Sequence, residues 1–130
     1  MSVLAGRRIL VVEDEVVVAM MVEDMLLDLG CDVVGPAARL DQGLQLAADE
    51  ALDAAILDVN LNDRRSYPIA EELRRRGVPF LFATGYAAEE VRCHDAEAPI
   101  IRKPYDGPMI EAALRCLLSS GTNPEPDDAG

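Results

Sequence analysis

Short, uninterrupted runs of apolar residues recur along this 130-residue chain, and they constrain its fold more than any other feature. Runs of this length suit strands that are buried on both faces, as in a parallel sheet covered by helices. Between the runs, apolar residues recur at steps of three and four, which is typical of amphipathic helices. The runs lie at 9–12, 33–34, 54–57, 80–83 and 100–101, and we expect the helices within 18–29, 40–47, 68–77 and 106–117.

Strands that alternate with helices need right-handed crossovers, which place helices on both faces of the sheet. We therefore predict an α/β fold with a doubly wound, five-stranded parallel sheet of flavodoxin-like (β/α)5 order 2-1-3-4-5. The segment 87–98 offers only Val91 as a large apolar anchor, so a helix there should be short or mobile. One domain should cover residues 1–118, and the acidic, proline-bearing residues 119–130 should form a disordered tail that leaves no room for an output domain.

The charge of the chain excludes some classes of partner. Lys and Arg total 12 against 24 Asp and Glu, so the net charge is −12. This surface would repel polyanions, and we expect no binding to nucleic acid or to a membrane. No signal-peptide pattern opens the chain, which favours a cytoplasmic protein. We expect neither a disulfide nor a zinc site from Cys31, Cys93 and Cys116, and we expect the single histidine, His94, in a surface loop.

Polar side chains follow four of the apolar runs. The first run leads into Glu13 and Asp14, the third into Asp58, the fourth into Thr84, and Lys103 comes just after the fifth. Because sites in such sheets form at the carboxyl ends of the strands, beside the point where strand order reverses, we expect these groups to converge. Carboxylates gathered in one crevice repel one another unless a cation lies among them, and their oxygen atoms suit Mg²⁺.

The same residue types fit phosphoryl transfer. Asp58 stands alone on the central strand, where its carboxylate could attack a phosphoryl group in line. Thr84 supplies a hydroxyl donor and Lys103 a cation for the charge on the transferred group. A cis Lys103–Pro104 peptide bond would direct the lysine into the crevice. Each residue alone could instead cap a helix or form a turn, but their coincidence at four strand ends favours a functional site.

The chain resembles the receiver domain of two-component response regulators, the CheY-like family, over residues 7–118. The resemblance rests on Ile-Leu-Val-Val-Glu-Asp at 9–14, Ile-Leu-Asp-Val-Asn at 56–60, Phe-Ala-Thr-Gly at 82–85 and Lys-Pro at 103–104. The run Pro-Phe-Leu-Phe-Ala-Thr-Gly-Tyr at 79–86 further resembles a subgroup of single-domain regulators typical of alphaproteobacteria, whose members lack DNA-binding domains.

The resemblance implies a signalling role instead of an enzyme that turns over a separate substrate. A sensor histidine kinase would phosphorylate Asp58, and a downstream protein or a phosphotransfer protein would receive the signal or drain the phosphate. Thr84 and Lys103 would contact the phosphoryl group and form the catalytic set with Asp58, while Thr84 and Tyr86 would act as the switch. The implied cofactor is Mg²⁺, with four ligand residues: Glu13, Asp14, Asp58 and, through its backbone carbonyl, Asn60.

Two features depart from the usual receiver pattern. The proline that commonly follows the phosphoacceptor closely is delayed by ten positions (68 − 58), to Pro68, so the intervening loop should be more mobile. Ile100 replaces the usual aromatic residue of the fifth strand, which removes the ring that commonly moves together with the threonine. Tyr86 is the candidate substitute, and we expect Tyr105 at the partner-facing edge.

Three alternatives stay open at this stage. A haloacid-dehalogenase-type phosphatase also uses a strand-end Asp, a Thr-Gly and a Lys with Mg²⁺, but its Asp-x-Asp motif is broken here at 14–16. A receiver-like adaptor that works without phosphate would keep its partner affinity in an Asp58→Asn variant. A flavin carrier of similar fold would need a phosphate-cradling first loop, which the chain lacks. The oligomeric state is equally open.

Overall fold

Strands and helices alternate along the chain as the apolar runs predict. The computed structural model describes residues 3–85, 88–95 and 98–121. Its strands are β1 (Arg8–Val12), β2 (Asp32–Ala37), β3 (Ala54–Asp58), β4 (Asn60–Leu61), β5 (Arg64–Arg65), β6 (Phe80–Thr84) and β7 (Ile100–Arg102). Its helices are α1 (Val16–Asp28), α2 (Leu40–Asp49), α3 (Tyr67–Arg75), α4 (Ala88–His94) and α5 (Gly107–Gly121).

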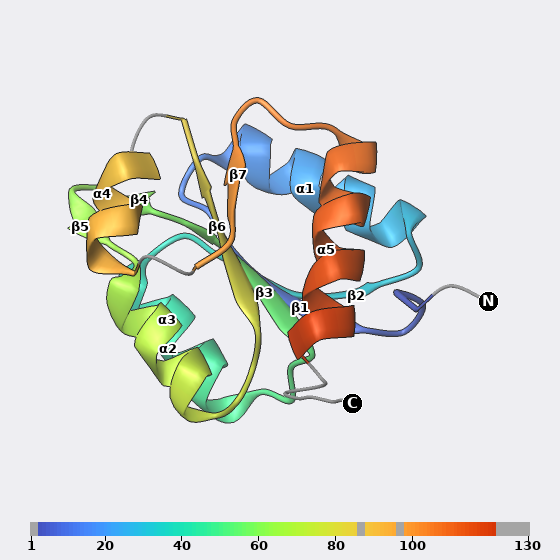
Figure 1. Ribbon diagram of the computed structural model, residues 1–130, viewed down its shortest axis with the longest axis horizontal. Coiled ribbons are helices and arrows are strands. Elements are labelled where there is room, and N and C mark those ends of the chain that lie inside the picture. The colour runs from blue at the N-terminus through green and yellow to red at the C-terminus, as the bar shows by residue number, and fades with distance from the viewer. Residues whose placement is uncertain (1–2, 86–87, 96–97, 122–130) are drawn as a thin grey trace.

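The main sheet has the strand order β2-β1-β3-β6-β7, and all its neighbouring strands are parallel. Counted along the main sheet alone, this is the predicted order 2-1-3-4-5, so the predicted fold class is confirmed. Helices α1 and α5 cover one face, and α2, α3 and α4 lie on the other (Figure 1). The strand order reverses between β1 and β3, which puts the crevice of this fold at their carboxyl ends.

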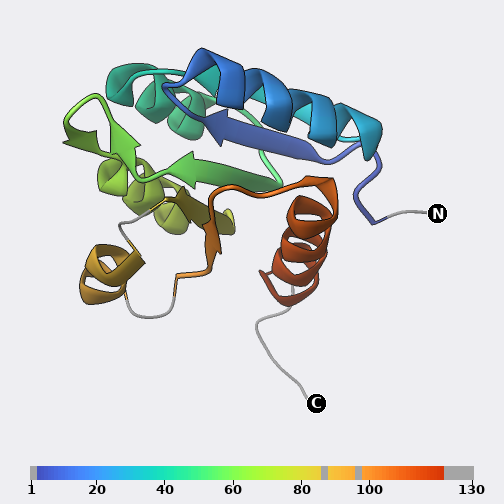
Figure 2. The ribbon, with the colours of Figure 1, turned by 90° about the horizontal axis from the view of Figure 1, so that it is seen from above.

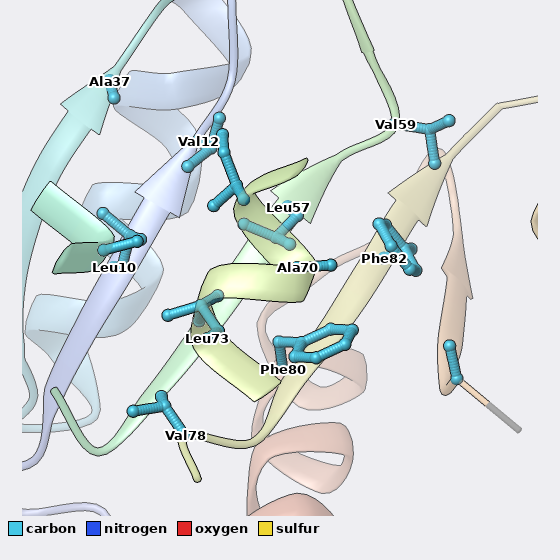
Figure 3. Packing of buried hydrophobic residues seen from close by; sticks show 14 of the residues in the cluster. Leu10, Val12, Ala37, Leu57, Val59, Ala70, Leu73, Val78, Phe80 and Phe82 are labelled. Atoms are coloured by element: carbon cyan, nitrogen blue, oxygen red, sulfur yellow. The ribbon is translucent and has the colours of Figure 1, made fainter. Parts of the chain in front are cut away.

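Two hydrophobic cores flank the sheet because successive residues of each strand point to opposite faces. In β3, Leu57 belongs to the cluster under α2 and α3, while Ile56 belongs to the cluster under α1 and α5. On the first face, Ala70 and Leu73 of α3 pack over the strands (Figure 3). Each fully buried leucine of this kind stabilises the fold by about 1.5–3 kcal/mol, so the strands that carry the site residues rest on a rigid base.

The segment after β3 departs from the sequence prediction. We expected a more mobile loop there, but β4 and β5 pair as an antiparallel hairpin, drawn in green beyond the end of β3 (Figure 2). Its turn holds Asn62 and Asp63 at φ 48° and 69°. Two consecutive positive φ angles are characteristic of a type I′ turn, and Asn and Asp tolerate that conformation better than most side chains.

The weakly anchored segment does contain a helix. Helix α4 is seven residues long, and Val91 is its fully buried anchor, as the sequence suggested. His94 is exposed, as expected, but it is the last residue of α4 and does not lie in a loop, and its ring stacks on that of Tyr67. At the carboxyl end, α5 continues past Leu118 to Gly121, and the rest of the expected tail, 122–130, lies outside the described residues, as does Tyr86.

All three cysteines lie among the described residues. Cys31 is buried, Cys93 and Cys116 are exposed, and none of them forms a disulfide bond. Within the described ranges, no helix combines the length and the apolar character needed to cross a membrane.

Candidate functional site

The carboxyl ends of β1, β3, β6 and β7 meet at one edge of the sheet and bring the candidate residues together. Asp14, Asp58, Thr84 and Lys103 line one cavity of about 310 Å³. Glu13 adjoins it, because its carboxylate lies next to those of Asp14 and Asp58. The four separate sequence motifs thus form one crevice, at the edge and the switch point where the predicted topology places it.

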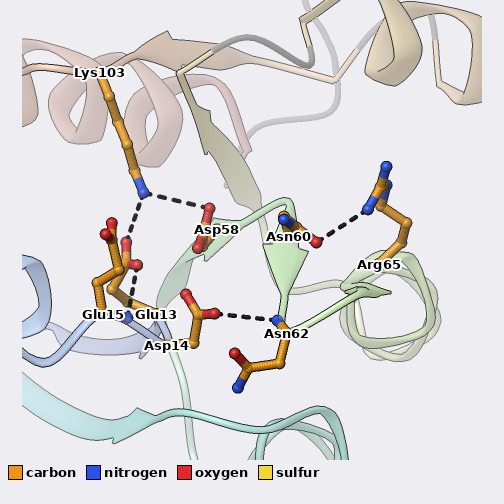
Figure 4. Close-up of polar contacts among 8 residues, drawn as sticks. All are labelled: Glu13, Asp14, Glu15, Asp58, Asn60, Asn62, Arg65 and Lys103. Atoms are coloured by element: carbon orange, nitrogen blue, oxygen red, sulfur yellow. Dashed lines mark hydrogen bonds and ion pairs between the residues drawn. The ribbon is translucent and has the colours of Figure 1, made fainter.

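Lys103 places its ammonium group between two carboxylates of this crevice (Figure 4). Its Nζ lies 3.0 Å from Oε1 of Glu13 and 3.4 Å from Oδ1 of Asp58. The Lys103–Pro104 peptide bond is cis, as predicted, and the backbone N–H of Lys103 donates to the carbonyl of Thr84. Burial lowers the pKa of Lys103, but the hydrogen bond to Glu13 and the charge of Asp58 outweigh it and raise the pKa overall. The ammonium therefore stays charged between the two carboxylates.

Three carboxylates are packed unusually closely around that ammonium. Oxygen atoms of Glu13, Asp14 and Asp58 all lie within 4.8 Å of one another, and Glu13 and Asp58 are buried. Burial first, and then the charge of Glu13, raise the pKa of Asp58 from 3.8 to about 7, although Lys103 opposes the shift. One ammonium does not balance this cluster. A set of hard oxygen donors with an excess of negative charge fits a divalent cation such as Mg²⁺.

Backbone hydrogen bonds hold the acidic residues in place. Oε2 of Glu13 accepts from the N–H of Glu15 at 3.1 Å, and Oδ2 of Asp14 accepts from the N–H of Asn62 at 3.1 Å (Figure 4). The second bond joins the loop after β1 to the hairpin turn. Asn60, at the start of the hairpin, lines the same cavity, and Thr84 is buried at the end of β6. The type I′ turn therefore helps to shape the site.

Sequence reasoning missed two charged residues that line the crevice, Glu15 and Arg65. Arg65 lines the cavity from β5, and its Nη1 donates to Oδ1 of Asn60 at 3.0 Å. The one local signal for its placement is the Asn62-Asp63 dipeptide, which predicts a turn that folds β5 back along β4. Tyr86, the expected switch residue, lies outside the described residues.

Tyr105 lies beside the crevice. It is partly buried and borders an apolar groove with Val18, Met21 and Met25 of α1. Burial, followed by the charge of Glu13, raises its pKa to about 12. The phenol is therefore neutral at physiological pH and borders the surface between α1 and the loop after β7.

Comparison with known proteins identifies the family. Residues 9–115 match the family model described as the response regulator receiver domain. The chain belongs to this family. It is similar to SdrG from Sphingomonas melonis Fr1, with 41% identity over 91% of this chain and 99% of SdrG, and a TM-score of 0.77. It is also similar to the receiver domain of PhyR from Erythrobacter litoralis, with 25% identity over 96% of this chain and 99% of that domain, and a TM-score of 0.83.

Among curated proteins, this receiver domain is similar to a longer chain. It is 30% identical over 117 residues to the transcriptional regulatory protein PdtaR of Mycobacterium tuberculosis. The match covers 87% of this chain but 57% of PdtaR. The family places the protein among the response regulators of two-component systems, which are in general signalling proteins without an enzymatic activity of their own.

Proposed function

We propose that this receiver domain takes up a phosphoryl group on Asp58 from a sensor histidine kinase in a Mg²⁺-dependent reaction. The phosphorylated form then binds a protein partner or passes the phosphate back into a relay. The observation that carries this proposal is the cluster of three carboxylates, two of which, those of Glu13 and Asp58, contact Lys103. The similar protein SdrG has a solved BeF3-activated conformation, and beryllofluoride mimics a phosphoryl group on a carboxylate.

In the proposed reaction, Asp58 is the nucleophile. Its carboxylate oxygen forms a bond to phosphorus while the P–N bond of the donor's phosphohistidine breaks, and the imidazole leaves with the electron pair and takes up a proton. Lys103 faces Oδ1 of Asp58 and would pair with an oxygen of the transferred group. Thr84, at the end of the neighbouring strand, would donate its hydroxyl to another.

Glu13, Asp14, Asp58 and the backbone carbonyl of Asn60 are the residues that would hold Mg²⁺. When bound, Mg²⁺ supplies the positive charge that lets a phosphate group approach three carboxylates. The same charge favours the ionised form of Asp58, whose pKa is raised to about 7 by burial and by the charge of Glu13. The acid cluster thus makes nucleophilic attack depend on the cation.

Labelling with a small phosphodonor tests this function directly. We expect the protein, incubated with Mg²⁺ and acetyl phosphate, to gain one phosphoryl group by intact mass spectrometry. Asp58→Asn should gain none, because an amide oxygen is a much weaker nucleophile than a carboxylate. Asp63→Asn is the matched control: Asp63 is exposed in the hairpin turn, where Asn also tolerates the positive φ, so labelling should be unchanged.

Other outcomes of this experiment point to the alternatives. Labelling of Asp58→Asn, or no labelling of the wild type, would contradict the proposed function. A phosphatase of the haloacid dehalogenase type would hydrolyse many equivalents of a phosphate ester instead of retaining one. If the protein is a phosphate-independent adaptor, the wild type and the Asp58→Asn variant should bind the partner with the same affinity. Family membership together with the intact acid cluster favours the phosphorylated switch over these alternatives.

A protein phosphodonor must also contact the surface that borders Asp58. Helix α1 begins directly after the loop that carries Glu13 and Asp14, and it exposes 71% of Val16, 69% of Val17 and 59% of Met20. Side chains this apolar on an exposed helix face are characteristic of a surface that binds another protein. We therefore expect the donor's phosphohistidine to enter beside this end of α1.

A substitution on this face should separate the protein donor from the small donor. The protein donor is a purified histidine kinase that labels the wild type. We expect Met20→Lys to slow phosphotransfer from this kinase about tenfold, since a buried charge at an interface costs at least 1.4 kcal/mol. Labelling by acetyl phosphate should be unchanged. Leu27→Lys is the control, because Leu27 is also exposed but lies about 10 Å further along the helix. Equal effects of the two variants on kinase transfer would contradict this docking site.

A further inference from the structure

Arg65 connects the crevice with α4. Its Nε and Nη2 donate to the two carboxylate oxygens of Glu90, at 2.7 and 3.1 Å, while its Nη1 donates to Oδ1 of Asn60. The same guanidinium lines the cavity that contains Asp58 and Lys103. Arg65 therefore has the candidate phosphorylation site on one side and a carboxylate of α4 on the other.

Glu90 is the main polar attachment of α4 to the rest of the domain. Besides the two hydrogen bonds from Arg65, Glu90 accepts a hydrogen bond from the hydroxyl of Tyr67 at 2.8 Å. The ring of Tyr67 in turn stacks on His94, with centroids 3.9 Å apart, and meets Phe82 edge-on. Past the end of the helix, Asp95 pairs with Arg74. Among the described residues, α4 buries two apolar side chains, Ala88 and Val91, so few apolar contacts fix its position there.

The ion pair between Arg65 and Glu90 can be exchanged at low cost. The two side chains are 44% and 42% exposed, and a pair this exposed contributes little to stability because solvent screens it. Phosphorylation of Asp58 would replace its carboxylate, which carries at most one negative charge, with a phosphoryl group that carries about two. Arginine binds phosphate oxygens through the same two-pronged geometry that it uses with Glu90, and the dianion is the stronger acceptor.

We propose that Arg65 is a switch residue that exchanges Glu90 for the phosphoryl group on Asp58, which detaches the Glu90 end of α4. This inference rests on the proposed function, because it needs the phosphoryl group. In this way phosphorylation at the crevice would change the surface at α4 without an aromatic residue of β7. The position of that aromatic residue is occupied here by Ile100. By linkage, whatever loosens Arg65 from Glu90 must also strengthen phosphoryl binding by the same factor.

Beryllofluoride with Mg²⁺ is the probe, because it occupies the phosphoryl position without turnover. Binding affinity is measured by calorimetry, and the opening of α4 by hydrogen–deuterium exchange of peptides that cover residues 88–95. In the wild type, we expect exchange in these peptides to rise by up to about fivefold with beryllofluoride, the ratio that corresponds to loss of about 1 kcal/mol. In Arg65→Gln, exchange should already be high, with no further rise, and beryllofluoride should bind about tenfold more weakly.

Glu90→Gln should change the affinity for beryllofluoride in the opposite direction. It frees Arg65 from its charged partner, so beryllofluoride should bind about threefold to fivefold more tightly while α4 exchanges fast in both states. A residue with a purely structural role would not raise affinity in this way. Arg64→Gln is the matched control: it removes the same charge from the same hairpin, but Arg64 borders a different cavity, and it should behave as the wild type in both measurements.

The outcomes separate the two proposals. If the wild type neither accepts phosphate from acetyl phosphate nor binds beryllofluoride, the proposed function fails and the role of Arg65 fails with it. If the wild type binds beryllofluoride but Arg65→Gln matches it in affinity and in α4 exchange, the role of Arg65 alone is overturned. The same conclusion follows if Glu90→Gln binds beryllofluoride no more tightly than the wild type.

Discussion

Lys103→Met is expected to lower the free energy of unfolding by about 2–4 kcal/mol at pH 8 in the presence of a chelator. The variant leaves Glu13 and Asp58 without their shared ammonium, and their side chains are 3% and 9% exposed. Removing one partner of a buried ion pair costs about 3–5 kcal/mol. The loss here should be somewhat smaller, because the crevice opens to solvent and Asp58 can take up a proton once its neighbour is gone.

Urea denaturation with and without millimolar Mg²⁺ checks this prediction. Mg²⁺ should recover most of the lost stability, and it should bind Lys103→Met about tenfold more tightly than the wild type, because the ammonium no longer competes for the same carboxylates. Arg102→Met is the control, since Arg102 is the exposed neighbour of Lys103 at the end of β7. The prediction is wrong if both variants are equally stable in the chelator.

The main sheet could be predicted from the sequence because its strands are buried on both faces. Each of the runs at 9–12, 54–57 and 80–83 is a strand in the structure, and no alternating polar face obscures it. The hairpin could not be predicted in the same way. Strands β4 and β5 are two residues each and include Asn60, Arg64 and Arg65, so they have no apolar pattern. Their pairing depends on backbone angles in the turn and on contacts with the site.

The candidate site likewise has a part that the sequence predicts and a part that it does not. The residues at the ends of buried strands were found because the topology dictates where those ends meet. The composition held a further signal, because Lys103 is the single lysine among the 12 basic residues. Arg65 was missed since its partner, Glu90, is 25 positions away on a helix with a weak apolar pattern. Such a contact depends on how α4 packs, and local sequence does not determine that.

Asp58→Asn should stabilise the metal-free protein, and the gain should grow with pH. The folded structure raises the pKa of Asp58 from 3.8 to about 7, chiefly through burial and then through the charge of Glu13. Below pH 3.8 the carboxyl is protonated in the folded and unfolded states, so it adds no cost. Between these values the unfolded chain loses the proton while the folded chain keeps it, and the free energy of unfolding falls. Above about pH 7 the full cost is present.

The amide cannot ionise and therefore removes this cost. The full shift corresponds to about 4 kcal/mol, but the crevice is open to solvent and the variant loses the charge contact with Lys103, so we expect a gain of about 1–3 kcal/mol at pH 8. Urea denaturation in a chelator between pH 4.5 and 8 should show the gap to the wild type closing as the pH falls. Asp63→Asn, at an exposed turn position, should show no such trend.

A gap that is constant with pH, or a variant less stable than the wild type at pH 8, would mean that the acid cluster is not strained in the metal-free protein. The predicted trend would instead identify the residue proposed to accept phosphate as one that destabilises its own fold until a cation binds.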